Sequence, residues 1–223
     1  MLRNIFGSNA RIIGVDLNPS CKVFEQYGFE IEILNQSDTK GWIQFFEKIG
    51  PVDVVLEDGG HTNLQQISTL INCVEHIRDG GVYLSEDTHT SYWREFGNPS
   101  KRSFIEFLKN IIDQVNSRGP RIKNVGLDQL KRVYSIQFFE SVVCLYIDGS
   151  KVMPSERITN SGKSLRHLDY RNLDKSVRSK LAKSQSGLSK RNSGLKKSLH
   201  YRIINILLAL IYRYENFSLR KYF

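Results

Sequence analysis

The 223-residue sequence is poor in cysteine and has no paired cysteine motif. Its three cysteines, Cys21, Cys73 and Cys144, are far apart, and no CxxC pair occurs. A disulfide-stapled scaffold is therefore not expected, and a reducing, cytoplasmic compartment fits best. Cys73 and Cys144 lie in apolar runs, which predicts that they are small core residues.

Long apolar runs are also missing. The opening MLRNIFGSNARIIG lacks the apolar region of a signal peptide. The run IINILLALIY (203–212) has ten residues, whereas a membrane-spanning helix needs about 20. We therefore expect no signal peptide and no segment that spans a bilayer unaided.

Acidic residues are scarce in the C-terminal third of the chain. Residues 151–223 hold 17 Lys and Arg but only 4 Asp and Glu, a balance of +13. Residues 1–150 hold 15 basic and 19 acidic residues, a balance of −4. The basic charge therefore says nothing direct about the first 150 residues. No nucleic-acid-reading motif accompanies it, so nucleic-acid binding is disfavoured.

Apolar, β-branched runs alternate with amphipathic segments over the first 150 residues. Strands are expected at 10–17, 29–34, 52–57, 82–86, 132–139 and 141–148, and helices from about 20 and at 39–50, 63–81 and 101–119. This order predicts an α/β fold with a doubly wound, mostly parallel sheet and a terminal antiparallel strand pair. The expected domains are an α/β domain (1–150), a basic flexible linker with at most short helices (151–200) and a C-terminal amphipathic helix (201–223).

Three of the expected strands end in acidic residues, namely Asp16, Glu57-Asp58 and Glu86-Asp87. Ligands of open α/β sheets bind outside the carboxyl ends of the strands. Parallel neighbours lie about 4.8 Å apart, so these carboxylates can converge, and they then repel one another unless a cation binds. Hard oxygen ligands suit Mg²⁺ better than zinc. A magnesium site is one prediction, and simple capping of the next turn or loop is the alternative.

His61 follows Asp58 by three residues in the turn DGGH, whose two glycines we expect to let the backbone turn sharply. Beside a divalent ion, a histidine with an intrinsic pKa of about 6.5 can take the proton of an alcohol. His61 is therefore a candidate general base, with a partly buried turn residue as the alternative. For His89, a second candidate for metal binding or proton transfer, packing on Tyr92 or Trp93 is favoured instead.

Two further acids follow strands near expected helix starts. Asp16 is predicted to accept hydrogen bonds from the hydroxyls of a ribose, with a cap before Asn18 and Pro19 as the alternative. Asp38, in NQSD, is expected either near the base of a nucleotide or at the N-cap of the helix that starts at Thr39. The sequence does not choose between these two roles.

Several of these segments together resemble a known family. RIIGVDLNPSC, NQSD, VDVVLEDGGHT, GGVYLSEDTHTSYW and YSIQFFESVVCLY, in this order over residues 3–148, resemble the macrolide sugar O-methyltransferase group of class I S-adenosylmethionine-dependent methyltransferases. The pair of DGGH and EDTHTSYW is fairly specific. The resemblance implies that Asp58, Glu86 and Asp87 bind Mg²⁺ and that His61 is the general base.

The resemblance also implies a cofactor and an acceptor. S-adenosylmethionine would be held by Asp16 at the ribose and by Asp38 near the adenine, with Glu57 facing the cofactor side or solvent. A sugar pocket would take His89, Tyr92 and Trp93. The acceptor would be a small molecule or a glycan.

One family feature is not found in the chain. The family's first strand is followed by a Gly-rich loop, E-x-G-x-x-x-G, and no such loop precedes Asp16. We therefore expect an N-terminally truncated methyltransferase-like domain without that strand.

The expected activity is S-adenosylmethionine-dependent, Mg²⁺-assisted O-methylation of a sugar hydroxyl on a glycoside, natural product or surface glycan. The alternative is a non-catalytic methyltransferase-like protein that binds a glycan or a partner. A metal-dependent oxygenase is disfavoured, because only His61, His89 and Asp58 approximate the two-histidine, one-carboxylate iron triad.

The basic tail lies outside the resemblance, and its role is left open. One hypothesis is peripheral contact with an anionic membrane surface through an amphipathic helix at 201–214. A protein partner or a second subunit in a homo-oligomer is another, and a solvated tail with a packed terminal helix is the third.

Overall fold

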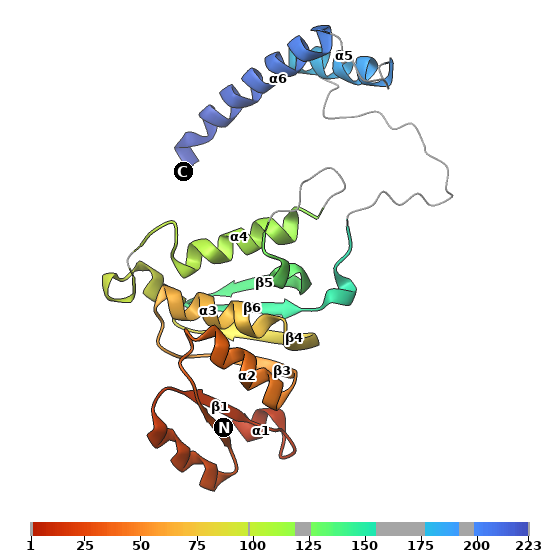
Figure 1. The fold of residues 1–223 in the computed structure, drawn as a ribbon. Coiled ribbons are helices and arrows are strands. Elements are labelled where there is room, and N and C mark those ends of the chain that lie inside the picture. The colour runs from red at the N-terminus through yellow and green to blue at the C-terminus, as the bar shows by residue number, and fades with distance from the viewer. Residues whose placement is uncertain (1, 98, 119–125, 155–176, 192–198, 223) are drawn as a thin grey trace. The chain divides into compact units, whose positions relative to one another are not determined.

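The computed structural model describes residues 2–97, 99–118, 126–154, 177–191 and 199–222. The chain divides into two compact units, residues 1–157 and residues 158–223. All strands of the described residues belong to the first unit, and the described part of the second unit is helical (Figure 1).

Six strands of the first unit form two sheets. In the smaller sheet, β1 (Ile13–Asp16) pairs in parallel with β2 (Glu30–Ile33). The larger sheet has the order β3-β4-β6-β5. Its strands are β3 (Val52–Glu57), β4 (Ile77–Ser85), β6 (Val142–Ile147) and β5 (Val133–Phe139).

Strand directions agree with the predicted fold class. β3 pairs with β4 in parallel, whereas β6 is antiparallel to both β4 and β5. The α/β class and the terminal antiparallel pair are thus confirmed. β1 and β3 each keep one edge without a strand partner among the described residues.

Three helices cover one face of the larger sheet (Figure 1). They are α2 (Thr39–Ile49), α3 (Asn63–Val74) and α4 (Phe104–Asn116), with α3 in contact with both others. Phe46, Leu70 and Leu108 from the helices are buried in one cluster with Tyr83 and Leu145 from the sheet. Each such side chain contributes about 1.5–3 kcal/mol of hydrophobic stabilisation, so this helix layer holds the β3–β4 edge in place.

Local signals in the sequence explain where these helices begin. Asp38 caps α2 by accepting a hydrogen bond from the Lys40 N–H. Thr62 and Gln65 form a reciprocal capping box at α3, and Ser103 caps α4. These side chains satisfy backbone N–H groups that have no partner within the helix.

One predicted boundary is wrong. The helix expected at 63–81 ends at Val74, and residues 77–81 belong to β4. Ile77 is buried opposite Val52, and Arg78 binds the Asp53 carboxylate at 2.9 Å across the two strands. Pairing with β3 therefore outweighs the helical pattern, and the Gly80-Gly81 pair lies inside the strand.

The start of the chain differs in detail from its prediction. A short helix α1 (Leu2–Phe6) precedes β1, which covers only residues 13–16 of the expected strand 10–17. The helix expected after Pro19 is a 3₁₀ helix, η1 (Pro19–Tyr27), capped by the Asn18 side chain.

The second unit contains α5 (Val177–Arg191), α6 (Leu199–Ser218) and the 3₁₀ turn η7 (Leu219–Tyr222). The 15-residue α5 contradicts the expectation of at most short helices in the linker. The rest of that prediction, at 155–176 and 192–198, lies outside the described residues. Within the described residues, no helix has the length and apolar character needed to cross a membrane.

Candidate active site

The candidate site lies where β3 and β4 end. Because these strands are parallel neighbours, the turns after Glu57 and Ser85 leave the sheet at the same edge. The first turn, residues 58–62, leads into α3. The second, residues 86–87, leads into the 3₁₀ turn η2 (Thr88–Tyr92).

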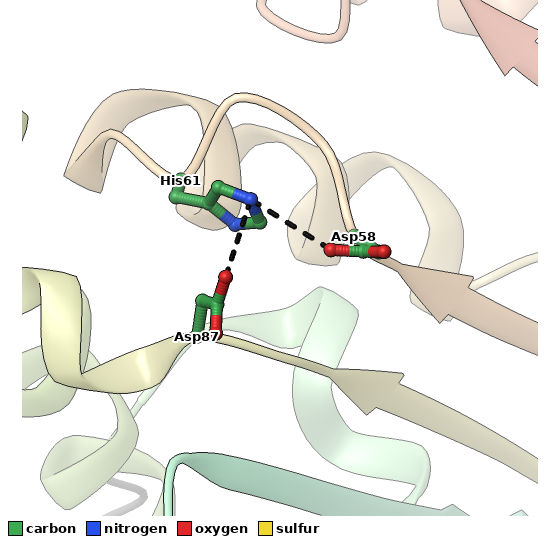
Figure 2. Close-up of side chains that lie close together, drawn as sticks. All are labelled: Asp58, His61 and Asp87. Atoms are coloured by element: carbon green, nitrogen blue, oxygen red, sulfur yellow. Dashed lines mark ion pairs between the residues drawn. The ribbon is translucent and has the colours of Figure 1, made fainter.

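Three side chains from these turns meet (Figure 2). The His61 Nε2 atom lies 3.7 Å from Asp58 Oδ1 and 3.5 Å from Asp87 Oδ2. One ligand-type atom from each residue lies within 4.8 Å of the other two. The His61 ring is mostly buried, at 18% side-chain exposure, while the carboxylates of Asp58 and Asp87 face solvent at 60% and 46%. The arrangement can hold a cation and leaves it open to an incoming ligand.

Glu86 is outside this cluster. Its backbone N–H donates to the Glu57 carbonyl, and its carbonyl accepts from the amide of the fully buried Gln66. Among the described residues, the group that could hold a metal consists of Asp58, His61 and Asp87. The structure thus brings together two of the three predicted carboxylate ligands, with the predicted base between them.

The backbone of the DGGH turn differs from the expectation that its two glycines let it turn sharply. His61 has a φ of 57° and Asp87 a φ of 53°, the left-handed region that non-glycine residues rarely adopt, whereas neither Gly59 nor Gly60 has a positive φ. A Cβ on either glycine would overlap the Gln36 or Gln65 side chain. The glycines therefore provide room, and His61 makes the turn.

Thr90 ties the two turns together, and sequence reasoning missed it. Its side chain is 2% exposed, and its hydroxyl oxygen lies 3.0 Å from the His61 carbonyl and 2.8 Å from the Asp87 carbonyl. One buried hydroxyl thus contacts the backbone of both residues in the left-handed region. Nothing in the run THTS distinguishes Thr90 from its neighbours.

Glu57 is 4% exposed, so of its two predicted positions, on the cofactor side or in solvent, the solvent one is wrong and the cofactor-side one stays a prediction. It accepts hydrogen bonds from Ser85 Oγ at 2.5 Å, Gln36 Nε2 at 3.1 Å and the Gly59 N–H at 3.3 Å. Gln36 in turn accepts from the Gly60 N–H at 2.8 Å. Glu57 and Gln36 therefore join the segment after β2 to the DGGH turn.

An aromatic wall borders the cluster. The His89 ring meets Trp93 edge-on at 4.7 Å between centroids, as the packing alternative for His89 predicts. Phe96 lies 5.9 Å from Trp93 and 6.4 Å from His61, again between ring centroids. His89 Nδ1 also contacts Ser141 Oγ, and Tyr92 and Trp93 are more than half and about half exposed. The wall therefore presents open aromatic surface beside the cluster.

The two acids at the smaller sheet are satisfied locally. Asp16 accepts a hydrogen bond from the Asn18 N–H at 2.7 Å, and this bond and the Cys21 thiol lower the pKa of the Asp16 carboxyl. Asp38 caps α2, one of its two predicted roles. Both carboxylates are solvent-facing, and their contacts with a ribose and an adenine remain predictions.

The arrangement of the helices and strands matches solved methyltransferase structures. The MycE methyltransferase of the mycinamycin biosynthetic pathway, in complex with Mg and SAH, superposes with a TM-score of 0.56 and 22% sequence identity, over 62% of this chain and 36% of that one. A complex of MycE that also contains mycinamycin VI gives a TM-score of 0.54. The first unit therefore has a class I methyltransferase, Rossmann-like fold.

Sequence comparison leads to a narrower group. The chain is 32% identical to L-olivosyl-oleandolide 3-O-methyltransferase of Streptomyces antibioticus over 111 residues, 47% of this chain and 28% of that enzyme. It is 33% identical to mycinamicin VI 2''-O-methyltransferase of Micromonospora griseorubida over 86 residues, 36% of this chain and 22% of that enzyme. Demethylmacrocin O-methyltransferase of Streptomyces fradiae is 28% identical over 109 residues.

These relatives confirm the predicted resemblance to macrolide and related sugar O-methyltransferases. The matched part of the chain spans between about a fifth and a third of the length of each relative. No protein-family model matches the chain.

Proposed function

We propose that the protein is an S-adenosylmethionine-dependent, Mg²⁺-assisted O-methyltransferase that acts on a sugar hydroxyl. Relatives named for methylation of olivosyl, rhamnosyl and mycinamicin sugars support this substrate class. The observation that carries the proposal is the convergence of Asp58, His61 and Asp87 at one sheet edge. The three free cysteines agree with a cytoplasmic location for the reaction.

The cluster fits a divalent cation chemically. Two carboxylates that face one another across one histidine repel when ionised, and a cation relieves that repulsion. Their exposure leaves space for water and for acceptor oxygens, as Mg²⁺ requires. Asp58 and Asp87 would hold the ion, and Glu86 is retained as a third proposed ligand. His89 is engaged with Ser141 and Trp93, which disfavours the iron-triad alternative.

His61 is the residue we propose to move the proton. When bound, Mg²⁺ lowers the pKa of an acceptor hydroxyl and S-adenosylmethionine supplies an electrophilic methyl group. His61 Nε2 faces the two carboxylates and would accept the proton of an acceptor hydroxyl held beside them. Methyl transfer would then leave a methyl ether, S-adenosylhomocysteine and a protonated His61.

The chain's other residues would position the reactants. Asp16 keeps its carboxylate ionised at the end of β1, which suits the acceptance of hydrogen bonds from ribose hydroxyls. Asp38 would lie near the adenine. Glu57 would act on the cofactor side indirectly. It accepts a hydrogen bond from the Gly59 N–H and so holds the backbone of the DGGH turn in place. His89, Tyr92 and Trp93 would line the sugar pocket.

The direct test is methyl transfer from isotopically labelled S-adenosylmethionine to an olivosyl or rhamnosyl glycoside, with Mg²⁺ and with EDTA. We expect transfer only with the metal, and a loss of about 100-fold or more in His61→Ala. Equal turnover in EDTA would remove the metal from the proposal. Full turnover in His61→Ala would remove His61 as the base.

A binding protein without catalysis is the second candidate. The split between the two sheets favours it, because β1, which carries Asp16, is not hydrogen-bonded to the sheet that carries the cluster. Calorimetry separates the two candidates. Heat of binding with S-adenosylmethionine supports the enzyme, and glycan binding without any cofactor heat at millimolar concentration supports the binding protein.

A further inference from the structure

Helix α6 has two apolar faces, and only one of them is covered. On the covered face, Ile204 and Leu208 are each 4% exposed. Helix α6 packs against α5 (Figure 1). The Gln185 amide of α5 also donates a hydrogen bond to the Asn205 side chain of α6. The two helices therefore form one packed unit. The second apolar face of α6 stays uncovered although α5 is in place.

The uncovered face is a continuous stripe. Its members recur every three or four residues, which places them on one side of the helix. Their exposed fractions range from 41% to 76%. We call this set the α6 stripe: Ile203, Ile206, Leu207, Leu210, Tyr214 and Phe217.

Basic residues lie along one border of the α6 stripe and near its C-terminal end. Between residues 177 and 223 the sequence has 11 Lys and Arg but a single acid, Glu215. Arg202 and Arg213 are exposed and are separated by about three helical turns, so they lie along one border of the stripe. Arg220 lies over the Phe217 ring, 4.6 Å from its centroid.

We propose that the α5–α6 unit binds the surface of an anionic lipid bilayer. The α6 stripe would enter the boundary between headgroups and acyl chains, and the arginines beside it would contact lipid phosphates. The apolar length of α6 is too short for a span, which agrees with a helix that lies in the plane of the interface. Such binding would keep the first unit at a membrane surface, and it does not depend on the proposed methyl transfer.

Charge decides between a bilayer and a second copy of the chain. The spacing of the α6 stripe would also suit a seam between two copies of α6. That seam would bring together two segments with the same strong positive charge, with Arg202 and Arg213 beside it and only Glu215 in each copy to compensate. An anionic surface provides the missing negative charge, so the composition favours lipid.

Vesicle sedimentation with the full chain tests the proposal. Vesicles of phosphatidylcholine alone are compared with vesicles in which about a third of the lipid is phosphatidylglycerol, a fraction high enough for a strongly negative surface potential. We expect about tenfold or more tighter binding to the anionic vesicles. Raising the salt concentration should weaken this binding, because it screens the surface potential.

Three variants separate the apolar and charged contributions. Leu207→Gln with Leu210→Gln removes the centre of the α6 stripe, and Arg202→Gln with Arg213→Gln removes the charges at its border. Each pair should lower anionic-vesicle binding about tenfold. The matched control, Ala209→Gln, changes an exposed position of α6 outside the stripe and should bind as the unchanged chain does. Circular dichroism must show unchanged helix content, which is expected because Ile204 and Leu208 are left in place.

Two results would overturn the proposal. One is equal binding to neutral and anionic vesicles, or none to either. The other is a dimer in light scattering that Leu207→Gln with Leu210→Gln converts to a monomer while vesicle binding stays unchanged, because the stripe would then serve a second copy.

Discussion

Acidic residues follow strands in both sheets of the first unit, but they behave differently. At the smaller sheet, Asp16 and Asp38 each bond a backbone N–H two residues further along the chain. At the larger sheet, Glu57 bonds Gln36 and Ser85, and Asp58 and Asp87 from two different turns both approach His61. The same sequence pattern thus produces local caps in one place and a convergent cluster in the other. The difference comes from the neighbouring strand: Asp16 at the end of β1 lies opposite Ile33, whereas Glu57 at the end of β3 lies opposite Ser85, and the two turns that follow carry Asp58 and Asp87.

The largest effect is expected from removal of the buried acid of the convergent edge. Glu57→Leu would leave the fully buried Ser85 hydroxyl without its acceptor and would take from the half-buried Gln36 amide one of its two acceptors, the other being Thr69. It should cost about 3 kcal/mol of unfolding free energy. Urea denaturation measures it. Glu47→Leu, at an exposed position of α2, is the control and should change stability by less than about 0.5 kcal/mol. Similar small losses in both variants would show that the convergent network is unimportant for stability.

The next largest effect concerns the cation. Mn²⁺, used as a paramagnetic probe for a Mg²⁺ site, should bind the chain about tenfold more weakly after Asp58→Asn or Asp87→Asn, because each change removes one charged oxygen ligand. Electron paramagnetic resonance titration measures free Mn²⁺. Asp53→Asn, at the opposite end of β3, is the control and should leave the affinity unchanged. Glu86→Gln, measured in parallel, decides whether this third proposed ligand contributes.

A smaller effect is expected from the local caps. Asp38→Ala removes the acceptor for the Lys40 N–H at the start of α2 and should cost about 1 kcal/mol of unfolding free energy. Asp38→Asn keeps a capping oxygen and should recover most of the loss. If the two variants lose the same stability, the charge of Asp38, rather than its cap, is what the fold uses.

The smallest effect concerns pH. The pKa of Asp16 is lowered in the folded chain from its ordinary value of 3.8, first by the Asn18 N–H and then by the Cys21 thiol. Asp16 therefore contributes stability above that ordinary value, and this contribution is lost as the pH falls through the lowered folded pKa. The urea midpoints of the unchanged chain and Asp16→Asn should differ slightly near neutral pH and converge in acid, as the pH falls below the ordinary value of 3.8 and through the lowered folded pKa. A difference that grows in acid would contradict this account.

Most of the fold could be predicted because its signals are local. Asp38 caps the start of α2 and Gly50 ends it, and the observed helix covers residues 39–49 of the expected 39–50. The boundary between α3 and β4 could not be predicted in the same way. Gly80-Gly81 resembles a helix stop, but pairing of Ile77 with Val52 places it in a strand, and a partner 25 residues away leaves no trace in local periodicity.

The candidate site, like the fold, was predictable only where its signals are local. Asp58, His61 and Asp87 could be named from strand ends and turn spacing, and the structure brings their side chains together. The residues that hold them in place, Gln36 and Thr90, act through hydrogen bonds to groups 24 and 29 positions away. No single-sequence pattern encodes contacts of that range, because they depend on which segments the core brings together.

The sequence by itself determined the alternation of strands and helices, the placement of acids at strand ends and the three-residue spacing from Asp58 to His61. Only the tertiary structure decided which of those acids meet. Successive residues leave a strand on opposite sides, so Glu57 is buried and Asp58 is exposed, although they are neighbours. The parallel register of β3 and β4 then sets Asp87, rather than Glu86, opposite His61. That choice depends on backbone direction and on the packing of α3, which are properties of the folded chain.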